Sequence, residues 1–152
     1  APRWESIAWL QQQTTLPIIL KGILHPQDAL QAKQLGLAGV VVSNHGGRAL
    51  EGSPASLAVL PQVRAAVGDD FMLLLDGGIR RGSDVFKALA LGAQAVFLGR
   101  PQAYGLGAAG AVGVAQMLRL LREELELTMA LAGCVTLAEI TSASLVNPNE
   151  LS

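Results

Sequence analysis

A histidine and an arginine that stand three residues apart, His45 and Arg48, follow a short β-branched run in this sequence. The run, Val40–Val42, is typical of a buried strand because valine favours the extended conformation. Two glycines between the histidine and the arginine allow a tight turn, so both side chains are expected at the carboxyl end of the strand. A titratable base beside a fixed cation suits proton abstraction from an anionic substrate whose carboxylate the guanidinium holds. For His45 taken alone, a purely structural histidine is the alternative.

Two further segments that combine glycine with arginine follow apolar runs, namely Asp76-Gly77-Gly78-Ile79-Arg80-Arg81 and Gly99-Arg100-Pro101. Backbone N–H groups at such glycines can point at phosphate oxygens, and an arginine can hold the same anion through two parallel hydrogen bonds. The competing interpretation is that the glycines only mark turns and the arginines face solvent. The presence of both segments at neighbouring strand ends favours a phosphate site. No Walker sequence and no Gly-x-Gly-x-x-Gly follows a predicted strand, which argues against P-loop and Rossmann sites.

Lys21 stands at the end of another apolar run, residues 16–20. A lysine in this position either points into the site or reaches out to solvent, and the sequence leaves both open. In the site it would stabilise negative charge that develops on a bound cofactor or substrate. No metal site is expected, because two distant histidines, His25 and His45, and the single cysteine, Cys134, have no ligand spacing.

Four strand–helix units are expected to position these residues. The predicted strands, 16–20, 39–42, 71–75 and 95–98, do not alternate between polar and apolar residues, which is typical of parallel strands buried on both faces. Helices are predicted from Trp4 to Gln13, from His25-Pro26 to Gly36 and from about Ala111 to Ala132. Two more are predicted to begin at serine caps: one after Ser53, with Pro54 in its first turn, and one after Ser83, which ends at about Gly92.

Consecutive βα units imply parallel strands of the α/β class, either in an open doubly wound sheet or in a (β/α)8 barrel. A full barrel takes about 250 residues, so 152 residues form half of one. Both architectures place ligands at the carboxyl ends of the strands. The two glycine–arginine loops favour the barrel, because the loops after its seventh and eighth strands commonly bind phosphate. The sequence therefore predicts a single half-barrel domain over residues 1–152.

The composition excludes several classes of protein. A net charge of −1, with 51% apolar and 15% charged residues, indicates one compact unit that is too apolar for disorder and too neutral for a nucleic-acid surface. No apolar run approaches the roughly 18 residues of a membrane helix, so no transmembrane segment is expected. A lone cysteine favours a reducing compartment, with the cytoplasm as the default. The start, Ala1–Trp4, has neither an initiator Met nor a signal core and predicts a cut end.

Four motifs occur in a fixed order along the chain: Leu16-Pro17-Ile18-Ile19-Leu20-Lys21-Gly22, Ser43-Asn44-His45-Gly46-Gly47-Arg48, Asp76-Gly77-Gly78-Ile79-Arg80-Arg81-Gly82 and Gly99-Arg100-Pro101. Together they resemble the FMN-dependent 2-hydroxy-acid oxidase and dehydrogenase family, which includes glycolate oxidase, lactate oxidase, lactate dehydrogenase and mandelate dehydrogenase. The resemblance runs from about Trp4 to Ala143. It implies a (β/α)8 TIM barrel of which this chain is the C-terminal half, strands five to eight.

The resemblance implies FMN as cofactor and assigns roles by position. His45 would be the catalytic base, and Arg48 would pair with the substrate carboxylate. Lys21 would lie near the N1 and O2 edge of the flavin, which Ser43 would also contact. The ribityl-phosphate arm would be held by Asp76, Gly77, Gly78, Ile79, Arg80, Gly99 and Arg100. The implied reaction is oxidation of an (S)-2-hydroxy acid to a 2-oxo acid, with two electrons passing to the flavin.

The chain departs from the family pattern after Arg48, where it has Ala49-Leu50-Glu51 in place of Gln, an aliphatic residue and Asp. The first four strands of the family supply tyrosines that touch the substrate and an aspartate that orients the histidine; Tyr104 matches none of these positions. Four strands leave two exposed sheet edges, so we expect an N-terminal half-barrel or a second copy as partner, and a homo-oligomer. Peroxisomal and membrane-associated members of the family leave the location open.

Two alternatives to this hypothesis stay open. Another FMN- or phosphate-binding barrel enzyme, such as an isomerase, would keep the glycine–arginine loops but would not need His45 paired with Arg48. A half-barrel without catalytic activity would bind FMN weakly or only assemble with a partner.

Overall fold

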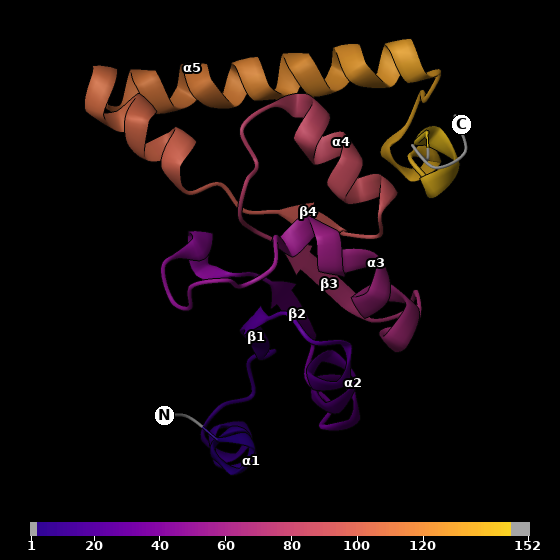
Figure 1. Ribbon diagram of the computed structural model, residues 1–152. Helices are drawn as coiled ribbons and strands as arrows, with labels where there is room; N and C mark the ends of the chain where they lie inside the picture. Colours follow the sequence, from indigo (N-terminus) through magenta and orange to yellow (C-terminus); the bar gives the residue numbers. More distant parts are fainter. Residues whose placement is uncertain (1–2, 147–152) are drawn as a thin grey trace.

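The computed structural model describes residues 3–146, so Ala1 and Pro2 of the expected cut end lie outside the described residues (Figure 1). Four strand–helix units follow a first helix, in the predicted order. The strands are β1 (Ile19–Ile23), β2 (Gly39–Val42), β3 (Met72–Leu75) and β4 (Ala95–Val96). The helices are α1 (Trp4–Gln13), α2 (Pro26–Gln34), α3 (Ser56–Val67), α4 (Gly82–Ala90) and α5 (Arg100–Ala132), with short 3-10 helices η1 (His45–Gly47), η2 (Leu137–Glu139) and η3 (Ser142–Ser144).

The four strands form one parallel sheet in the order β1-β2-β3-β4, so β1 and β4 are its edges. Leu20 pairs with Val40, and Val40 pairs with Leu73. The register of β1 against β2 shifts between Lys21 and Ile23, which places a bulge at the carboxyl end of β1. The sheet order is the one that consecutive right-handed βα units produce.

The core lies between one face of the sheet and helices α2, α3 and α4. Alternate strand residues, among them Val40 and Leu73, point to this face and are fully buried. They pack against Ala29, Ala32, Leu60, Val63, Val85 and Ala88 of the helices. On the opposite face Met72 and Phe97 are 40% and 50% exposed. Burial on both faces, as predicted, therefore holds for β2, all of whose residues are buried, but fails at Met72 and Phe97.

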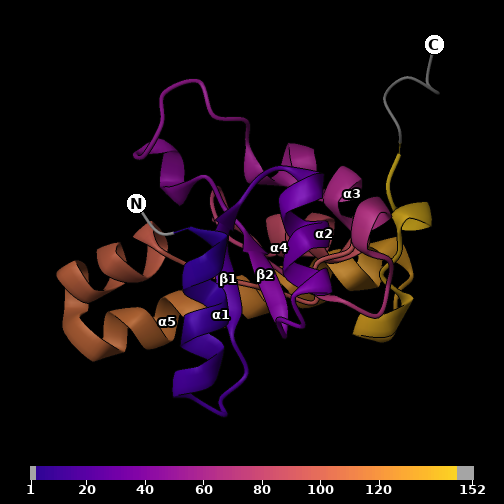
Figure 2. The same cartoon turned by 90° about the horizontal axis from the view of Figure 1, so that it is seen from below.

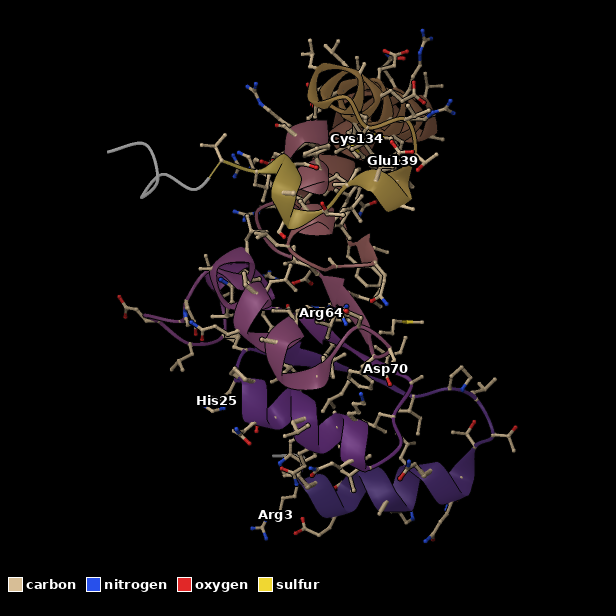
Figure 3. The ribbon with its side chains drawn as sticks, turned by 90° about the vertical axis from the view of Figure 1, so that its right-hand side faces the viewer. Arg3, His25, Arg64, Asp70, Cys134 and Glu139 are labelled. Atoms are coloured by element: carbon tan, nitrogen blue, oxygen red, sulfur yellow. The ribbon has the colours of Figure 1, made fainter. Side chains whose placement is uncertain are left out.

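Arg64 of α3 ties together the loops at the amino ends of the strands (Figure 3). Its guanidinium donates to the carbonyl oxygens of Gly92, at 2.6 Å and 3.1 Å, and of Phe71, at 2.9 Å. Burial lowers the pKa of this arginine below its ordinary value, although the nearby Asp69 and Asp70 act in the opposite direction. These contacts lie at the end of the sheet away from the predicted site, where a barrel keeps its stabilising interactions.

Two of the predicted helix caps are wrong. Ala55 rather than Ser53 precedes α3, and the Ser53 hydroxyl instead donates to the carbonyl oxygen of Leu50 at 2.8 Å. Helix α4 begins one residue before Ser83, because the Asp84 carboxylate accepts hydrogen bonds from two preceding backbone N–H groups at 2.9 Å and 3.0 Å. The His25 cap of α2 is confirmed, since its Nδ1 accepts from the Gln27 backbone at 3.2 Å.

The outer strands are also shorter or shifted relative to their predicted bounds. Strand β1 begins at Ile19, three residues later than predicted, because pairing starts opposite Gly39 and the preceding Pro17 has no N–H to donate. Strand β4 ends at Val96, although the backbone N–H of Phe97 still donates to Leu75 at 2.8 Å.

Helix α5 is longer than predicted and consists of two legs. Non-helical backbone angles at Ala109 and Gly110 break it, and Figure 1 shows the short first leg folding back beside the long second leg. The legs approach closely at Gly105 and Gly113: a Cβ atom on Gly105 would lie 2.8 Å from the Gly113 carbonyl oxygen. The absence of side chains at these two positions therefore allows the legs to cross.

By length and composition, α5 is the one helix among the described residues that could cross a membrane, so the absence of a transmembrane segment stays a prediction. An 18-residue window reaches a mean hydropathy of 1.2, and none of it is buried. Small residues, alanine and glycine, make up much of the uncharged stretch 101–118. The break at Ala109 and Gly110 falls inside that stretch, and a single helix of this kind is weak support for a membrane span.

Candidate active site

A cavity of about 510 Å³ lies at the carboxyl ends of the strands and joins residues that follow all four of them. Small-molecule sites typically have volumes of about 300–1,000 Å³. All but one of the predicted site residues line this cavity: Lys21, His45, Arg48, Asp76, Gly77, Gly78, Ile79, Arg80, Gly99 and Arg100. The exception is Ser43, which is fully buried. Tertiary structure thus brings together segments that are as much as 79 residues apart in sequence (Lys21 to Arg100).

Lys21 points toward the carboxyl ends of its neighbouring strands, which decides between the two directions that the sequence left open. Its Nζ lies 2.5 Å from Asp76 Oδ2 and donates to Ser43 Oγ at 2.8 Å. The lysine side chain is 45% exposed and the aspartate side chain 19%. The ammonium group is therefore held beside the cavity while it keeps contact with solvent.

Ser43 links the lysine to the loop that carries the histidine. Its hydroxyl accepts from Lys21 Nζ and also from the backbone N–H of His45, at 3.1 Å. Because Ser43 ends a fully buried strand, this hydroxyl is a fixed point for both neighbours. The predicted flavin contact of Ser43 is a separate matter and stays a prediction.

The loop after β2 is a tight turn that Asn44 and Ser56 stabilise. Asn44 Oδ1 accepts from the Gly46 backbone at 3.0 Å, and its side-chain amide donates to the Pro54 carbonyl oxygen at 3.2 Å. The backbone N–H of Asn44 donates to the buried Ser56 hydroxyl at 3.1 Å. Sequence reasoning assigned no role to either residue, although asparagine before two glycines is a recognisable turn signal.

His45 itself has a left-handed backbone, with φ of 56°, and its side chain is exposed at the cavity. Histidine is one of the few non-glycine residues that adopt this conformation with some frequency. Within residues 3–146 its imidazole makes no hydrogen bond, so the ring nitrogens are open to a ligand. Figure 2 shows that the segment between η1 and α3, which contains Arg48, stands away from the rest of the chain.

Three arginines give the cavity its positive charge. Arg48 and Arg80 line it from the loops after β2 and β3, and Arg100 lines it from the start of α5. Among residues 3–146 their guanidinium groups have no ion-pair partner, and all three side chains are exposed. The arrangement suits an anionic ligand with more than one charged group.

The loop after β3 turns through two glycines with positive φ, 92° at Gly77 and 85° at Gly78. No atom lies within 4 Å of where a Cβ atom of Gly78 or Gly99 would be, so space is open beside both. Asp76 Oδ1 is buried and has no hydrogen-bond partner within residues 3–146. A buried acceptor without a donor is costly unless a ligand supplies one.

Comparison with known proteins identifies the family. The profile of a family described as FMN-dependent dehydrogenase matches residues 1–147. The chain belongs to this family. L-lactate oxidase from Alicycliphilus denitrificans is 57% identical over 145 residues, which are 95% of this chain and 40% of that protein. A peroxisomal (S)-2-hydroxyacid oxidase from Arabidopsis thaliana is 53% identical over 147 residues, 97% of this chain and 40% of the relative.

Solved structures of the family agree with the fold. A mandelate oxidase variant with (S)-mandelic acid superposes with a TM-score of 0.89 at 48% identity, over 91% of this chain and 42% of that one. A variant with a monooxide FMN adduct superposes with a TM-score of 0.88 over 44% of its length. The predicted fold class is confirmed: the chain forms part of a (β/α)8 barrel. It spans about 40% of the length of the curated relatives it matches.

The residues at the cavity fit the FMN of this family. The orphaned Asp76 Oδ1 is an acceptor suited to a hydroxyl group of the ribityl chain. The backbone N–H groups of the Gly77–Gly78 turn and the guanidinium groups of Arg80 and Arg100 suit a phosphate. The Lys21 ammonium suits a group that becomes negatively charged on reduction.

Proposed function

We propose that this chain is the FMN-binding C-terminal half, strands five to eight, of a barrel that oxidises an (S)-2-hydroxy acid to a 2-oxo acid. The observation that carries the proposal is the position of a base, His45, the Arg48 guanidinium next to it in the same turn, and the Lys21 ammonium around a single cavity. A 2-hydroxy acid offers a proton to the base and a carboxylate to the guanidinium. The family membership and the named relatives support this reading.

Oxidation to the carbonyl group removes two electrons and two protons from the C–H and O–H bonds of the substrate; His45 takes up one of these protons, and the other leaves together with the two electrons. Arg48 binds the substrate carboxylate through two parallel hydrogen bonds and so sets the direction in which the hydroxyl-bearing carbon faces. Both residues lie in the turn that Asn44 and Ser56 hold in place. FMN, when bound, supplies the acceptor of the two electrons that the substrate loses.

The other cavity residues hold the cofactor. Lys21 stabilises negative charge at the flavin edge, and the Ser43 hydroxyl holds the lysine in place by accepting a hydrogen bond from its ammonium group. The ribityl-phosphate arm is held by Asp76, Gly77, Gly78, Ile79 and Arg80, and the phosphate also by Gly99 and Arg100.

The proposed partner is the first half of the barrel. Both edge strands are unpaired on one side among the described residues, and Ile19, Met72 and Phe97 leave an apolar sheet face exposed. On α5 the side chains of Leu120, Leu127 and Leu131, spaced to share one face, are 51%, 61% and 83% exposed. A soluble protein seldom leaves such edges and faces open. A second copy of this chain, in a homo-oligomer, is the alternative partner, and size-exclusion chromatography with light scattering distinguishes the two from a monomer.

The test uses what we call the completed barrel: residues 1–152 joined to the part of the Alicycliphilus denitrificans L-lactate oxidase that the match leaves out. We expect the purified protein to carry flavin absorbance, and L-lactate, glycolate or mandelate to bleach it under anaerobic conditions. His45→Ala should keep the flavin but slow its reduction by roughly 10²–10⁴-fold. A flavin-loaded completed barrel that no 2-hydroxy acid reduces would contradict the proposal.

One observation favours a second candidate, a half-barrel that assembles and binds FMN without catalysis. The His45 imidazole makes no hydrogen bond within residues 3–146, and a base that no hydrogen bond orients transfers protons poorly. Residues 1–152 expressed without the rest of the barrel test this: bound flavin that 2-hydroxy acids do not bleach supports it.

A reducing compartment, the cytoplasm by default, fits the lone buried Cys134, and the Arabidopsis thaliana relative is named peroxisomal.

A further inference from the structure

Gly22, which directly follows Lys21 on β1, lies against the His45 side chain. We propose that Gly22 is a positioning residue: because it lacks a side chain, it forms the surface on which the His45 imidazole rests. The proposal depends on the proposed function only for the role of His45 as base. The contact itself stands on geometry.

The nearest atom to the missing side chain is a ring nitrogen. A Cβ atom on Gly22 would lie 2.6 Å from His45 Nε2, 3.4 Å from Cε1 and 3.7 Å from Cδ2. Ordinary contacts of a Cβ atom are 3.4–4 Å, so the imidazole occupies the space that any other residue would fill. Glycine within a strand often marks such a close approach.

The backbone at Gly22 explains how the strand end reaches the ring. Its φ is 98°, and the pairing of β1 with β2 shifts register between Lys21 and Ile23. A bulge of this kind turns the strand end and redirects the side chains beside it. Lys21 thereby reaches Ser43, while the next residue presents bare backbone to the histidine.

Two contacts therefore place His45. The Ser43 hydroxyl accepts from its backbone N–H at 3.1 Å, and Gly22 limits where its ring can lie. Since the same serine binds Lys21, the lysine ammonium and the His45 backbone are held on one hydroxyl, and Gly22 alone of these contacts acts on the ring. Proton transfer needs heavy atoms within about 2.6–3.2 Å, so a ring displaced by about 1 Å should react about 100-fold more slowly.

A left-handed glycine is also strained by any substitution, so a matched control is needed. Gly36, between α2 and β2, has a φ of 74° and nothing within 4 Å of a built Cβ atom. Gly36→Ala therefore introduces the backbone strain without a contact to the histidine. Gly36 is outside the cavity lining.

The experiment compares Gly22→Ala and Gly36→Ala in the completed barrel, each alone and with His45→Ala, by thermal unfolding. We expect His45→Ala to restore part of the Tm that Gly22→Ala loses, namely the part due to the clash with the ring rather than to backbone strain, and to restore nothing to Gly36→Ala. Additive losses in both pairs would overturn the proposal. If Gly22→Ala does not fold, folding of its double variant with His45→Ala supports the proposal, and failure of that double variant overturns it.

Kinetics add a readout that a general structural role does not change. Steady-state kinetics with L-lactate should show kcat lowered about 100-fold in Gly22→Ala. The KM for L-lactate and the amount of bound flavin should stay close to those of the parent, while Gly36→Ala should keep the parent kcat. Equal kcat values in the two variants would overturn the positioning role. If the parent itself is not reduced, the proposed function fails, whereas the unfolding comparison still decides the Gly22–His45 contact.

Discussion

The Lys21 ammonium lies 2.5 Å from Asp76 Oδ2 and so connects the end of β1 to the loop after β3, across the intervening strand β2. The other carboxylate oxygen of Asp76 is buried without a donor. One side chain thus holds a cation through one oxygen and offers an acceptor through the other. This division of roles leads to a first prediction.

Asp76→Asn should weaken FMN binding by the completed barrel about tenfold or more. The variant keeps the shape of the side chain but loses the charge, and hydrogen bonds to charged groups contribute about 1.5–3 kcal/mol, where 1.4 kcal/mol is about tenfold in affinity. Quenching of FMN fluorescence during titration measures the affinity. Asp69→Asn, a substitution of an exposed aspartate outside the cavity lining, is the control. Unchanged affinity in Asp76→Asn would remove Asp76 from the proposed cofactor site.

Arg48→Lys should raise the KM for L-lactate by roughly 10–100-fold and affect kcat less. Lysine keeps the positive charge but cannot form two parallel hydrogen bonds to a carboxylate, a loss of about 1.5–3 kcal/mol. Steady-state kinetics of the completed barrel provide the measurement. The control is Arg81→Lys, because Arg81 is exposed and does not line the cavity. An effect on kcat alone would argue for a role other than carboxylate binding.

Gly113→Ala should destabilise the protein by about 1–3 kcal/mol, because a new methyl group would overlap the backbone at Gly105. The first leg of α5, which begins with Arg100 at the cavity, should shift with it and lower FMN affinity. Gly107→Ala is the matched control: nothing lies within 4 Å of its Cβ position, and alanine is favoured over glycine in a helix by about 1 kcal/mol. Urea unfolding should therefore show a lower free energy of unfolding for Gly113→Ala and a higher one for Gly107→Ala than for the parent.

The ion pair between Lys33 and Asp70 should contribute to the pH dependence of stability (Figure 3 labels Asp70). A hydrogen bond from Lys33, together with its charge, lowers the pKa of Asp70 below the usual 3.8. A lowered folded-state pKa stabilises the protein above the unfolded value, and this contribution is lost as pH falls through the folded value.

Lys33→Met should therefore reduce the slope of stability against pH in the acidic range below about pH 5. Urea unfolding midpoints at a series of acidic pH values measure it. Lys87→Met, at an exposed lysine without an ion pair among the described residues, controls for the loss of charge. The same slope in Lys33→Met and the parent would show that the pair has no effect on stability.

Much of the fold follows from local sequence patterns. The runs Val40–Val42 and 71–75 correctly predicted strands, and the His25-Pro26 pair correctly predicted the start of α2. The Ser53 and Ser83 caps failed because capping depends on which side chain reaches the first free N–H groups, and Asp84 reached those of α4. The sequence predicted only the second leg of α5, from about Ala111 to Ala132. The first leg was missed in part because its close contact with the second leg, at Gly105 and Gly113, forms only after the chain folds back.

The sequence alone determined which residue types stand at successive strand ends: a histidine, an arginine three residues on, and two glycine–arginine loops, since residue type and strand position are local properties. The roles of base and carboxylate-binding arginine stay predictions. The sequence did not determine the direction of Lys21, the roles of Asn44 and Ser56, or the contact between Gly22 and His45. Those depend on distances across the sheet, which the register of β1 against β2 and the bulge at Gly22 set. Only tertiary structure decides such relationships, because they join atoms from strands that meet after folding.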